Sequence, residues 1–327
     1  MAEVSKEKLL KMYRTMQTIR QFEERLRDLF KEGKVPGFVH VSIGEEASAT
    51  GVCAALTDTD YITSTHRGHG HLLAKGGKLK PMMAELFGRK TGYCKGKGGS
   101  MHIADFSIGI LGANGIVGAG LPIATGAGLA AKMKKSGQVA VCFFGDGASN
   151  EGTFHESLNI ASAWKLPVVY VCENNLYGEF TAGKDVTSVK DIADRARGHD
   201  MPGVIINGND VVEVYETTSE AVARARRGEG PTLIECKTYR WEGHVVGEEG
   251  FLGKKSYRPA DEIEEWKKRC PLITFESRFT ASGMFTKAEL EAIKAEASRD
   301  IAEAVQYAID SPLPAPEEAM EDMFSAA

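Results

Sequence analysis

The sequence predicts an α/β protein with a doubly wound, mostly parallel sheet and helices on both of its faces. The first observation is a strand–helix–strand unit, in which the apolar runs Val139–Phe144 and Val168–Cys172 flank a segment of helical spacing at 151–165. Within one sheet, such a unit is nearly always a right-handed parallel crossover. The second observation is that strand-like and helix-like segments alternate along the rest of the chain, which is typical of this fold class.

The chain begins with an amphipathic helix, expected over 6–31 and ending at Gly33. Its apolar residues recur in steps of three and four, at positions 9, 12, 16, 19, 22, 26 and 29. We expect this apolar face to cover the core or a partner subunit. Because no repeat and no linker interrupts the pattern, we expect a single domain over residues 1–327, made of the N-terminal helix, a core of about 35–240, a loop at 241–257 and a helical tail at 261–310.

The remaining elements follow from apolar period and from glycine or proline breaks. Two glycine-rich segments without period are expected to be loops: 88–102, which also carries lysines, and 241–257. A helix of small residues suited to close packing is expected at 121–132. In chain order, the other expectations are a helix opening at 44–46 and ending at 56, a strand over 60–63, helices over 79–87 and 186–196, a strand over 204–207, a helix over 211–227, a strand over 232–236, and helices over 261–268 and 287–309.

Composition indicates a globular protein and excludes several partners. Hydrophobic residues make up 43% and charged residues 26% of the 327 residues, and the net charge of −5 gives no reason to expect nucleic-acid binding. No apolar run approaches the ~20 residues that cross a bilayer, so we expect no membrane association. The six cysteines contain no CxxC pair, which favours a reduced, cytoplasmic chain over a disulfide framework or a zinc site.

Polar residues follow both strands of the central unit. The turn Gly145-Asp146-Gly147 ends the first strand, and Asn174-Asn175 ends the second. Ligands of open α/β sheets bind at this carboxyl edge, and carboxylate and amide oxygens suit Mg²⁺. The glycines and the following helix start would let a diphosphate approach backbone amides. Taken alone, each motif is equally an ordinary turn or strand end, and the combined spacing favours the binding site.

This spacing resembles the thiamin-diphosphate motif, and the resemblance extends over about residues 5–310. The chain is similar to the α subunits of thiamin-dependent E1 components, with the acetoin dehydrogenase branch nearest and the pyruvate and branched-chain 2-oxo acid branches next. The segments that carry the resemblance are HRGHGHLLAKGG (66–77), GRKTGYCKGKGGSMHIAD (88–105), LGANGIVGAG (111–120), FFGDGASNEGTFHESLN (144–159), WKLPVVYVCENNLYGE (164–179) and GPTLIECKTYR (230–240).

The resemblance implies roles for individual residues around Mg²⁺ and the diphosphate. The metal ligands would be Asp146, Asn175 and the main-chain carbonyl of Tyr177. The diphosphate would be bound by Arg67, as a bidentate cation, and by the turn of Gly145, Gly147 and Ala148, the last two through their amides.

Other residues are implied at the organic part of the cofactor. Gly115 and Val117 would offer main-chain contacts near the aminopyrimidine, and His40 and His244 would flank the thiazolium and the diphosphate. We expect these two histidines to transfer protons and to stabilise the lipoyl side, because an ordinary imidazole pKa suits general acid–base work. His66 stands where pyruvate enzymes of the family usually have tyrosine, and its cofactor contact is implied by position only.

The resemblance also implies the reaction and the partners. The enzyme would cleave acetoin, or decarboxylate a 2-oxo acid, and pass the acyl group to a lipoyl arm of an E2 protein. The activating carboxylate of the family lies on a separate β subunit, so we expect an α2β2 heterotetramer with an active site between chains. Within this chain, Glu45 and Glu46 are carboxylate candidates by residue type alone.

Two alternatives come from other motifs. His66-x-x-His69-x-His71 has a spacing that permits a metal-hydrolase site, but no acidic residue stands within it and Arg67 would repel a cation, so hydrogen-bonding roles for His69 and His71 are favoured. Residues 126–131 match GxGxxA, the fingerprint of NAD-dependent oxidoreductases, but no strand precedes them, which favours tight helix packing.

Overall fold

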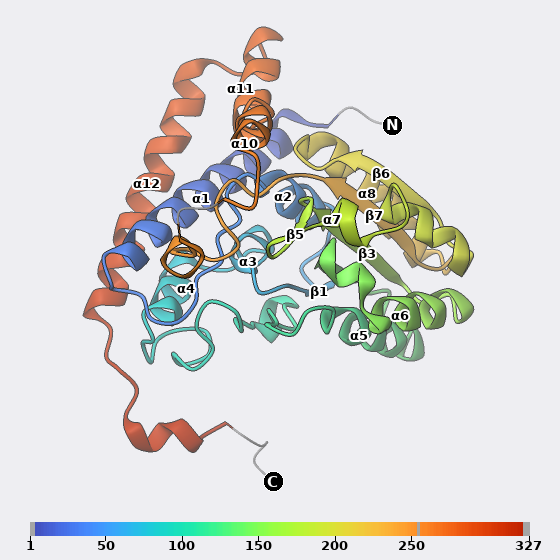
Figure 1. The fold of residues 1–327 in the computed structure, drawn as a ribbon, viewed down its shortest axis with the longest axis horizontal. Coiled ribbons are helices and arrows are strands. Elements are labelled where there is room, and N and C mark those ends of the chain that lie inside the picture. Colours follow the sequence, from blue (N-terminus) through green and yellow to red (C-terminus); the bar gives the residue numbers. More distant parts are fainter. Residues whose placement is uncertain (1–3, 254–255, 323–327) are drawn as a thin grey trace.

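The computed structural model describes residues 4–253 and 256–322 (Figure 1). Among them, five parallel strands form the main sheet in the order β1-β2-β3-β7-β6. A two-stranded antiparallel ribbon, β4-β5, lies apart from it. The predicted parallel α/β sheet is therefore confirmed. The strands are β1 (Tyr61–Thr63), β2 (Ala140–Gly145), β3 (Val168–Asn174), β4 (Tyr177–Gly178), β5 (Thr181–Ala182), β6 (Gly203–Asn207) and β7 (Thr232–Lys237).

Helices cover both faces of the sheet, because successive strand residues point to opposite sides. Along β2, Val141 and Phe143 join one apolar cluster, and Cys142 and Phe144 join the other. The first cluster includes residues of α2 (Glu46–Ala54) and α8 (Val211–Arg226), and the second includes residues of α5 (Gly120–Lys134) and α6 (Gly152–Ala163). Figure 1 shows α5 and α6 below the sheet and α2 and α8 above it.

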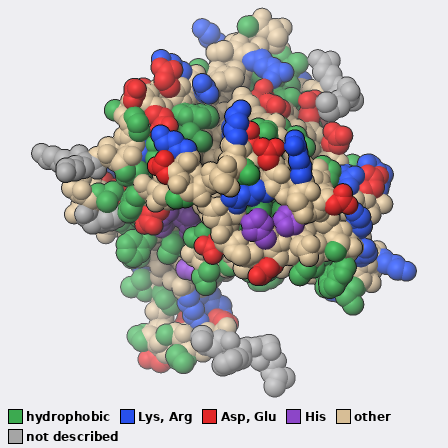
Figure 2. Space-filling model, turned by 45° about the vertical axis from the view of Figure 1, so that its right-hand side comes forward, with side chains coloured by type: hydrophobic (Ala, Val, Ile, Leu, Met, Phe, Trp, Pro, Cys, Tyr) green, Lys and Arg blue, Asp and Glu red, His purple; other side chains and the backbone are tan. Residues whose placement is uncertain are grey.

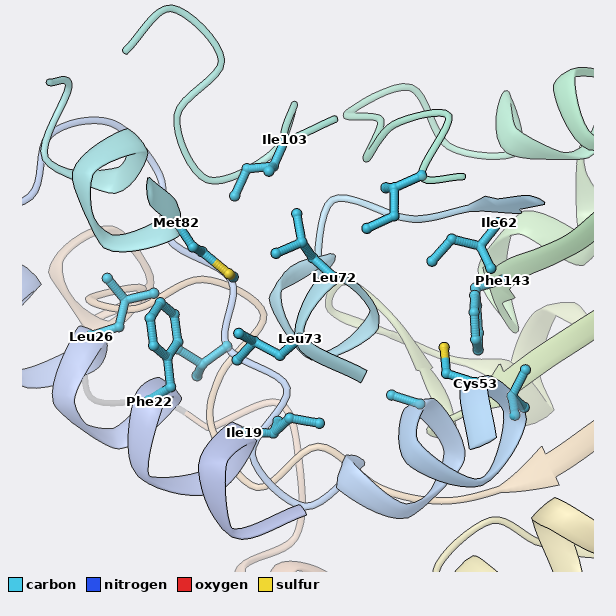
Figure 3. Packing of buried hydrophobic residues seen from close by; sticks show 14 of the residues in the cluster. Ile19, Phe22, Leu26, Cys53, Ile62, Leu72, Leu73, Met82, Ile103 and Phe143 are labelled. Carbon is cyan, nitrogen blue, oxygen red and sulfur yellow. The ribbon is translucent and has the colours of Figure 1, made fainter. Parts of the chain in front are cut away.

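The N-terminal helix α1 (Lys6–Lys31) is confirmed, and all seven of its predicted apolar residues are buried. Figure 3 shows Phe22 and Leu26 of this helix facing Leu73 of α3 (His69–Ala74) and Met82 of α4 (Leu79–Leu86). The face of α1 therefore covers the core of this chain. The tail helices are α10 (Ala260–Lys267), α11 (Pro271–Ala281) and α12 (Lys287–Asp310), and α12 runs along α1 and α4.

Three segments differ from expectation. The sequence predicts a helix over 186–196, but a single helical turn, α7 (Gly183–Val186), is followed by an irregular, bent segment at 187–191 and a 3-10 helix, Ile192–His199. The reason is a tertiary contact. The amide of Ala193 donates a hydrogen bond to the buried carboxylate of Glu235 on β7, at 2.8 Å, and this bond holds the beginning of the 3-10 helix against the sheet. Helices α3 and α11 are additional, and α3, with six residues, is too short to show a period.

The predicted loops are confirmed in part. Residues 88–102 have no regular structure, whereas 241–257 contains one helical turn, α9 (Glu249–Leu252), and residues 254–255 lie outside the described part. Short 3-10 turns occur at Phe106–Ile108, Gly147–Asn150 and Pro316–Met320.

The surface and the cysteines follow the composition. All six cysteines are free thiols. Figure 2 shows lysine and arginine side chains interspersed with acidic ones over the face in view. Within the described ranges, no helix combines the length and the apolarity needed to cross a membrane.

Candidate active site

A cavity of about 460 Å³ lies at the carboxyl ends of β1, β2 and β3. This volume is in the usual range for small-molecule sites. The structure brings every predicted site residue to its wall: His40, His66, Arg67, Gly115, Val117, Gly145, Asp146, Gly147, Ala148, Asn175, Tyr177 and His244. Segments as far apart in the sequence as those of His40 and His244 therefore converge on one site, and the predicted roles of these residues remain predictions.

Asp146 is placed by the end of β2. Gly145, the last residue of the strand, pairs with Glu173 of β3, so Asp146 and Asn174 emerge side by side at the sheet edge. The Asp146 side chain is 4% exposed, and its Oδ2 has no hydrogen-bond partner among the described residues. Burial raises the pKa of this carboxyl from 3.8 to about 6. Buried polar atoms nearly always have a partner, so this unpartnered carboxylate oxygen is a candidate to bind a cation.

Asn175 and Tyr177 are fixed by the turn after β3. The Oδ1 of Asn175 accepts a hydrogen bond from the amide of Tyr177 at 3.3 Å, and its Nδ2 donates to Glu45 Oε1 at 3.0 Å. Leu176, between them, has φ +74°, a left-handed conformation that a leucine seldom adopts. This strained turn brings the 175–177 backbone toward Asp146.

Two glycines allow a close approach where two turns meet. A Cβ on Gly147 would lie 3.3 Å from the Cα of Gly178, and a Cβ on Gly178 would lie 3.3 Å from the Cα of Gly147. Either side chain would push the turn after β2 away from the turn after β3. The two glycines therefore hold the amides of 147–148 beside the Asn175 turn, as a phosphate site needs.

Arg67 forms part of the buried wall. Its Nη1 donates to the carbonyl of Val41 at 2.6 Å, its Nη2 to the carbonyl of His244 at 3.2 Å, and its Nε lies 3.7 Å from Glu45 Oε2. A guanidinium has five N–H donors, so these contacts leave donors for an anion in the cavity. Burial lowers the pKa of Arg67, while Glu45 opposes the shift.

Three histidines gather on the same side of the cavity. The ring centroids of His40 and His66 are 4.8 Å apart, those of His40 and His244 are 5.0 Å apart, and those of His66 and His244 are 5.1 Å apart. Burial, followed by the charge of Arg67, lowers the pKa of His40 and of His244 to about 2, and that of His66 well below its ordinary value. The expectation of an ordinary imidazole pKa is therefore wrong for this structure, because the sequence does not reveal burial next to a guanidinium.

His69 and His71 have the hydrogen-bonding roles that the sequence favours. The His69 ring bonds to Glu23 at 2.9 Å and to Ser100 at 2.9 Å. The His71 ring bonds to Ser64 at 2.7 Å and to Glu173 at 3.1 Å. The 66-69-71 metal-hydrolase site is therefore not formed.

Two buried glutamates, Glu45 and Glu173, line the cavity; the sequence named Glu45, together with Glu46, by residue type alone and did not single out Glu173. Glu45 contacts both Asn175 and Arg67, whereas Glu46 pairs with Arg20 of α1 at 2.6 Å, away from the cavity. Burial and Glu173 raise the pKa of Glu45 to about 7, against the effect of Arg67. Burial alone would raise the pKa of Glu173, but His71 and Ser48 hold it below its usual value. No spacing in the sequence distinguishes Glu45 from Glu46.

Two exposed apolar side chains, Ile116 and Val117, line part of the cavity. Val117 is 51% exposed and Ile116, beside it, is 72% exposed, and both line the cavity. Large apolar side chains exposed at the mouth of a site indicate a surface that another protein covers.

The GxGxxA match lies inside a helix. Residues 126–131 form the middle of α5, and among the described residues no strand leads into them. A Cβ on Gly128 would lie 2.4 Å from Val168 Cγ2, so this glycine allows α5 to pack on β3. The dinucleotide interpretation is therefore not supported.

The fold and the cavity define a class: α/β proteins with a polar site at the carboxyl edge of a parallel sheet, built for an anionic ligand with a hard cation. The chain belongs to the dehydrogenase E1 component family, whose sequence model matches residues 14–317.

Individual relatives agree with this membership. The α subunit of acetoin:2,6-dichlorophenolindophenol oxidoreductase from Bacillus subtilis is 50% identical over 322 residues, which cover 98% of this chain and 95% of that protein. Its counterpart from Cupriavidus necator is 48% identical over 323 residues, with coverages of 98% and 95%. The chloroplastic pyruvate dehydrogenase E1 component subunit alpha-3 of rice (Oryza sativa subsp. japonica) is 40% identical over 331 residues, with coverages of 98% and 77%.

Family membership confirms the resemblance seen in the sequence and makes the chain an E1 α-type enzyme subunit. It implies dependence on thiamin diphosphate. The α-subunit names of the relatives imply a β-subunit partner.

Proposed function

We propose that this chain is the α subunit of a thiamin-diphosphate-dependent E1 component that cleaves acetoin and passes the acyl group to a lipoyl group on an E2 protein. The observation that carries the proposal is the single cavity in which Asp146, Asn175 and Arg67 converge from three strand ends. The relatives at 50% and 48% identity, both named for acetoin, support this substrate.

Mg²⁺ is proposed to bind Asp146, Asn175 and the carbonyl of Tyr177. The fit rests on the buried, unpartnered Oδ2 of Asp146 and on a donor set of hard oxygens. The amides of Gly147 and Ala148, next to Gly145, and the remaining donors of Arg67 would hold the diphosphate. When bound, thiamin diphosphate supplies a carbanion that adds to a carbonyl carbon.

His40 and His244 are proposed to move protons at the reacting carbons, beside His66. A pKa of about 2 keeps both rings neutral but makes them weak bases while the cavity holds no anion. A diphosphate next to Arg67 would offset the guanidinium charge that contributes to these shifts, and the imidazole pKa values would rise toward the useful range. Gly115 and Val117, which also line the cavity, would contact the aminopyrimidine through their main chain.

The β subunit is proposed to complete the site in an α2β2 heterotetramer. Glu45 and Glu173 are both hydrogen-bonded within the chain, Glu45 at the metal end of the cavity, which supports an activating carboxylate from elsewhere. The exposed Ile116 and Val117 would be covered by that subunit. We propose a cytoplasmic location, which is in keeping with six free thiols.

A 2-oxo acid is the second candidate substrate, because the rice relative at 40% identity is named for pyruvate. The test is to co-express the chain with its β partner and to assay acetoin, pyruvate and branched-chain 2-oxo acids with a dye acceptor. We expect turnover of acetoin that requires Mg²⁺ and thiamin diphosphate, and none from the α chain alone. Preferred turnover of a 2-oxo acid would transfer the assignment to that branch, and activity of the pure α chain would contradict the shared site.

A further inference from the structure

The carboxylate of Glu262, on α10, contacts the side chain of a proposed metal ligand from outside the cavity. Its Oε2 accepts a hydrogen bond from the hydroxyl of Tyr177 at 2.7 Å and another from the hydroxyl of Tyr239 at 3.1 Å. Tyr177 is the residue whose main-chain carbonyl is proposed to bind Mg²⁺. Glu262 lines a separate cavity of about 170 Å³, whose wall also includes Asp146 and Tyr177. Glu262 can therefore reach the proposed metal site only through another residue.

The turn that carries Asn175 and Tyr177 needs support from its surroundings. Leu176 has φ +74°, and a residue in such a strained conformation persists only where neighbouring groups fix it. Its amide donates to Asn174 Oδ1 at 3.1 Å, and its carbonyl accepts from the amide of Gly183 at 2.8 Å. The next residue, Tyr177, carries both the proposed ligand carbonyl and the ring that reaches Glu262. Fixing that ring restricts the backbone from which the carbonyl projects.

Helix α10 contacts this region through one face. Glu262 and Trp266 are spaced i, i+4 and so lie on the same side of the helix. The Trp266 ring stacks on Tyr239, with ring centroids 5.6 Å apart and an angle of 9° between the planes. The Tyr239 ring in turn meets that of Tyr177 edge-on, at 6.2 Å. No residue of α10 is buried, so the Glu262 contact adds little to the core and mainly holds the Tyr177 ring.

We propose that Glu262 is a positioning residue for the metal site: it accepts the Tyr177 hydroxyl, fixes the ring, and thereby keeps the Tyr177 carbonyl in place beside Asp146. This role rests on the proposed function, because the Mg²⁺ ligands are assigned there. A charged acceptor makes a stronger hydrogen bond than a neutral one, so removing the carboxylate would leave the Tyr177 ring held by packing alone.

The experiment is calorimetric titration of the metal-free α/β complex with MgCl₂ at saturating thiamin diphosphate. We expect Glu262→Ala to weaken Mg²⁺ binding by about five-fold or more, because a charge-assisted hydrogen bond is lost. Glu262→Gln keeps an oxygen that can accept the tyrosine hydroxyl and should stay within about two-fold of wild type. The matched control is Glu265→Ala, which removes an exposed carboxylate of the same helix, paired with Lys268, and should leave Mg²⁺ binding unchanged.

Two tyrosine variants separate positioning from general stability. Tyr177→Phe should weaken Mg²⁺ binding as Glu262→Ala does, and the double variant should be no weaker than either, because both remove one interaction. Tyr239→Phe removes the other hydroxyl bonded to the same oxygen and should leave Mg²⁺ binding unchanged. At saturating Mg²⁺, the affinity for thiamin diphosphate should be that of wild type in every variant. Equal losses in the two tyrosine variants, or a parallel loss of cofactor affinity, would reduce Glu262 to a structural role.

Wild-type Mg²⁺ affinity in a folded Glu262→Ala complex overturns the positioning role. If this variant does not fold by circular dichroism, Tyr177→Phe decides the question, since it removes a single hydroxyl group. A wild-type complex that binds no Mg²⁺ in the presence of thiamin diphosphate contradicts the proposed function itself, and the positioning role with it.

Discussion

Asp146 is the residue at which stability and proposed function oppose each other. Its carboxylate is buried with an unpartnered oxygen, and burial raises its pKa from 3.8 to about 6. Above that pH the metal-free chain keeps a negative charge in a desolvated place, which costs stability. A bound cation would turn the same charge into a binding group.

Asp146→Asn should therefore act in two directions. With chelator at pH 7.5, we expect the free energy of unfolding to rise by about 1–3 kcal/mol, since the raised pKa corresponds to a penalty of this size. In calorimetry, the affinity for thiamin diphosphate with Mg²⁺ should fall at least ten-fold. Asp58→Asn, which alters an exposed carboxylate, should change neither quantity, and wild-type cofactor affinity in Asp146→Asn would exclude Asp146 as a metal ligand.

The buried histidines predict a loss of stability in acid. The pKa of His40 is about 2 in the folded chain and 6.5 ordinarily, so below pH 6.5 the unfolded chain binds a proton that the folded chain does not. The free energy of unfolding should thus decrease as the pH falls from 6.5 toward 2. Denaturant unfolding at pH 7 and at pH 5 measures this decrease. Between these two pH values, the free energy of unfolding of His40→Phe should fall by about 1–2 kcal/mol less than that of wild type. His155→Phe, which changes an exposed histidine, is the control and should lose as much stability as wild type. If His40→Phe also loses as much as wild type, His40 is not the source of the acid effect.

Among the elements, α4 organises the glycine- and lysine-rich loop through one carboxylate. Glu85 is fully buried, and its two oxygens accept four main-chain amides, those of Cys94, Gly96, Gly98 and Gly99, at 2.8–3.0 Å. The loop at 88–102 thereby has a defined shape without regular secondary structure. Its lysines instead form surface ion pairs, such as those of Lys95 and Lys97 with Asp322.

Glu85→Gln should destabilise this loop strongly. An amide group replaces one accepting oxygen with a donor, so buried N–H groups lose their partner, and we expect a loss of about 2–4 kcal/mol in the free energy of unfolding. Limited proteolysis should become faster within 88–102. Asp322→Asn removes a carboxylate that contacts the same loop in water and should cost less than about 0.5 kcal/mol. Similar effects of the two variants would contradict the buried role of Glu85.

Helix α5 provides a matched pair of glycines. A Cβ on Gly128 would lie 2.4 Å from Val168 Cγ2, whereas a Cβ on Gly126 would meet nothing within 4 Å. We expect Gly128→Ala to lower the free energy of unfolding by about 1–3 kcal/mol through overpacking against β3. Gly126→Ala should raise it by up to about 1 kcal/mol through helix propensity. Denaturant unfolding of both variants tests the packing, and equal shifts would contradict it.

The whole molecule leaves an apolar surface uncovered beside its cavity. Besides Ile116 and Val117 at the mouth, exposed apolar residues occur on the neighbouring α5 and α6, at Ile123, Met133 and Ile160. Helices α5 and α6 pack together on one face of the sheet, and α5 begins three residues after Val117 (Figure 1). This region is where we expect the β subunit to bind.

Ile116→Glu should therefore prevent assembly without unfolding the chain. A charge at the mouth costs little in the free chain, because Ile116 is 72% exposed, but would be buried in the complex. We expect the wild-type melting temperature, and loss of the α/β complex in size-exclusion chromatography. The control is Ile273→Glu. Ile273 is 58% exposed and belongs to α11, which lies at the top of Figure 1, whereas α5 lies at the bottom. Complex formation by Ile116→Glu as in wild type would place the β subunit elsewhere.

Local signals determined much of this protein. The steps of three and four in α1, the buried strands on either side of α6, and the position of Asp146 and Asn175 after neighbouring strands follow from period and from parallel pairing, so the sheet and its ligand-binding edge were predictable. Tertiary structure alone decided which distant side chains share a desolvated environment. It directs Glu45 to the cavity and Glu46 to Arg20, and it brings His40, His66 and His244 together beside Arg67, which changes their protonation. The physical reason is that burial and long-range electrostatics depend on contacts between segments, which a linear sequence does not specify.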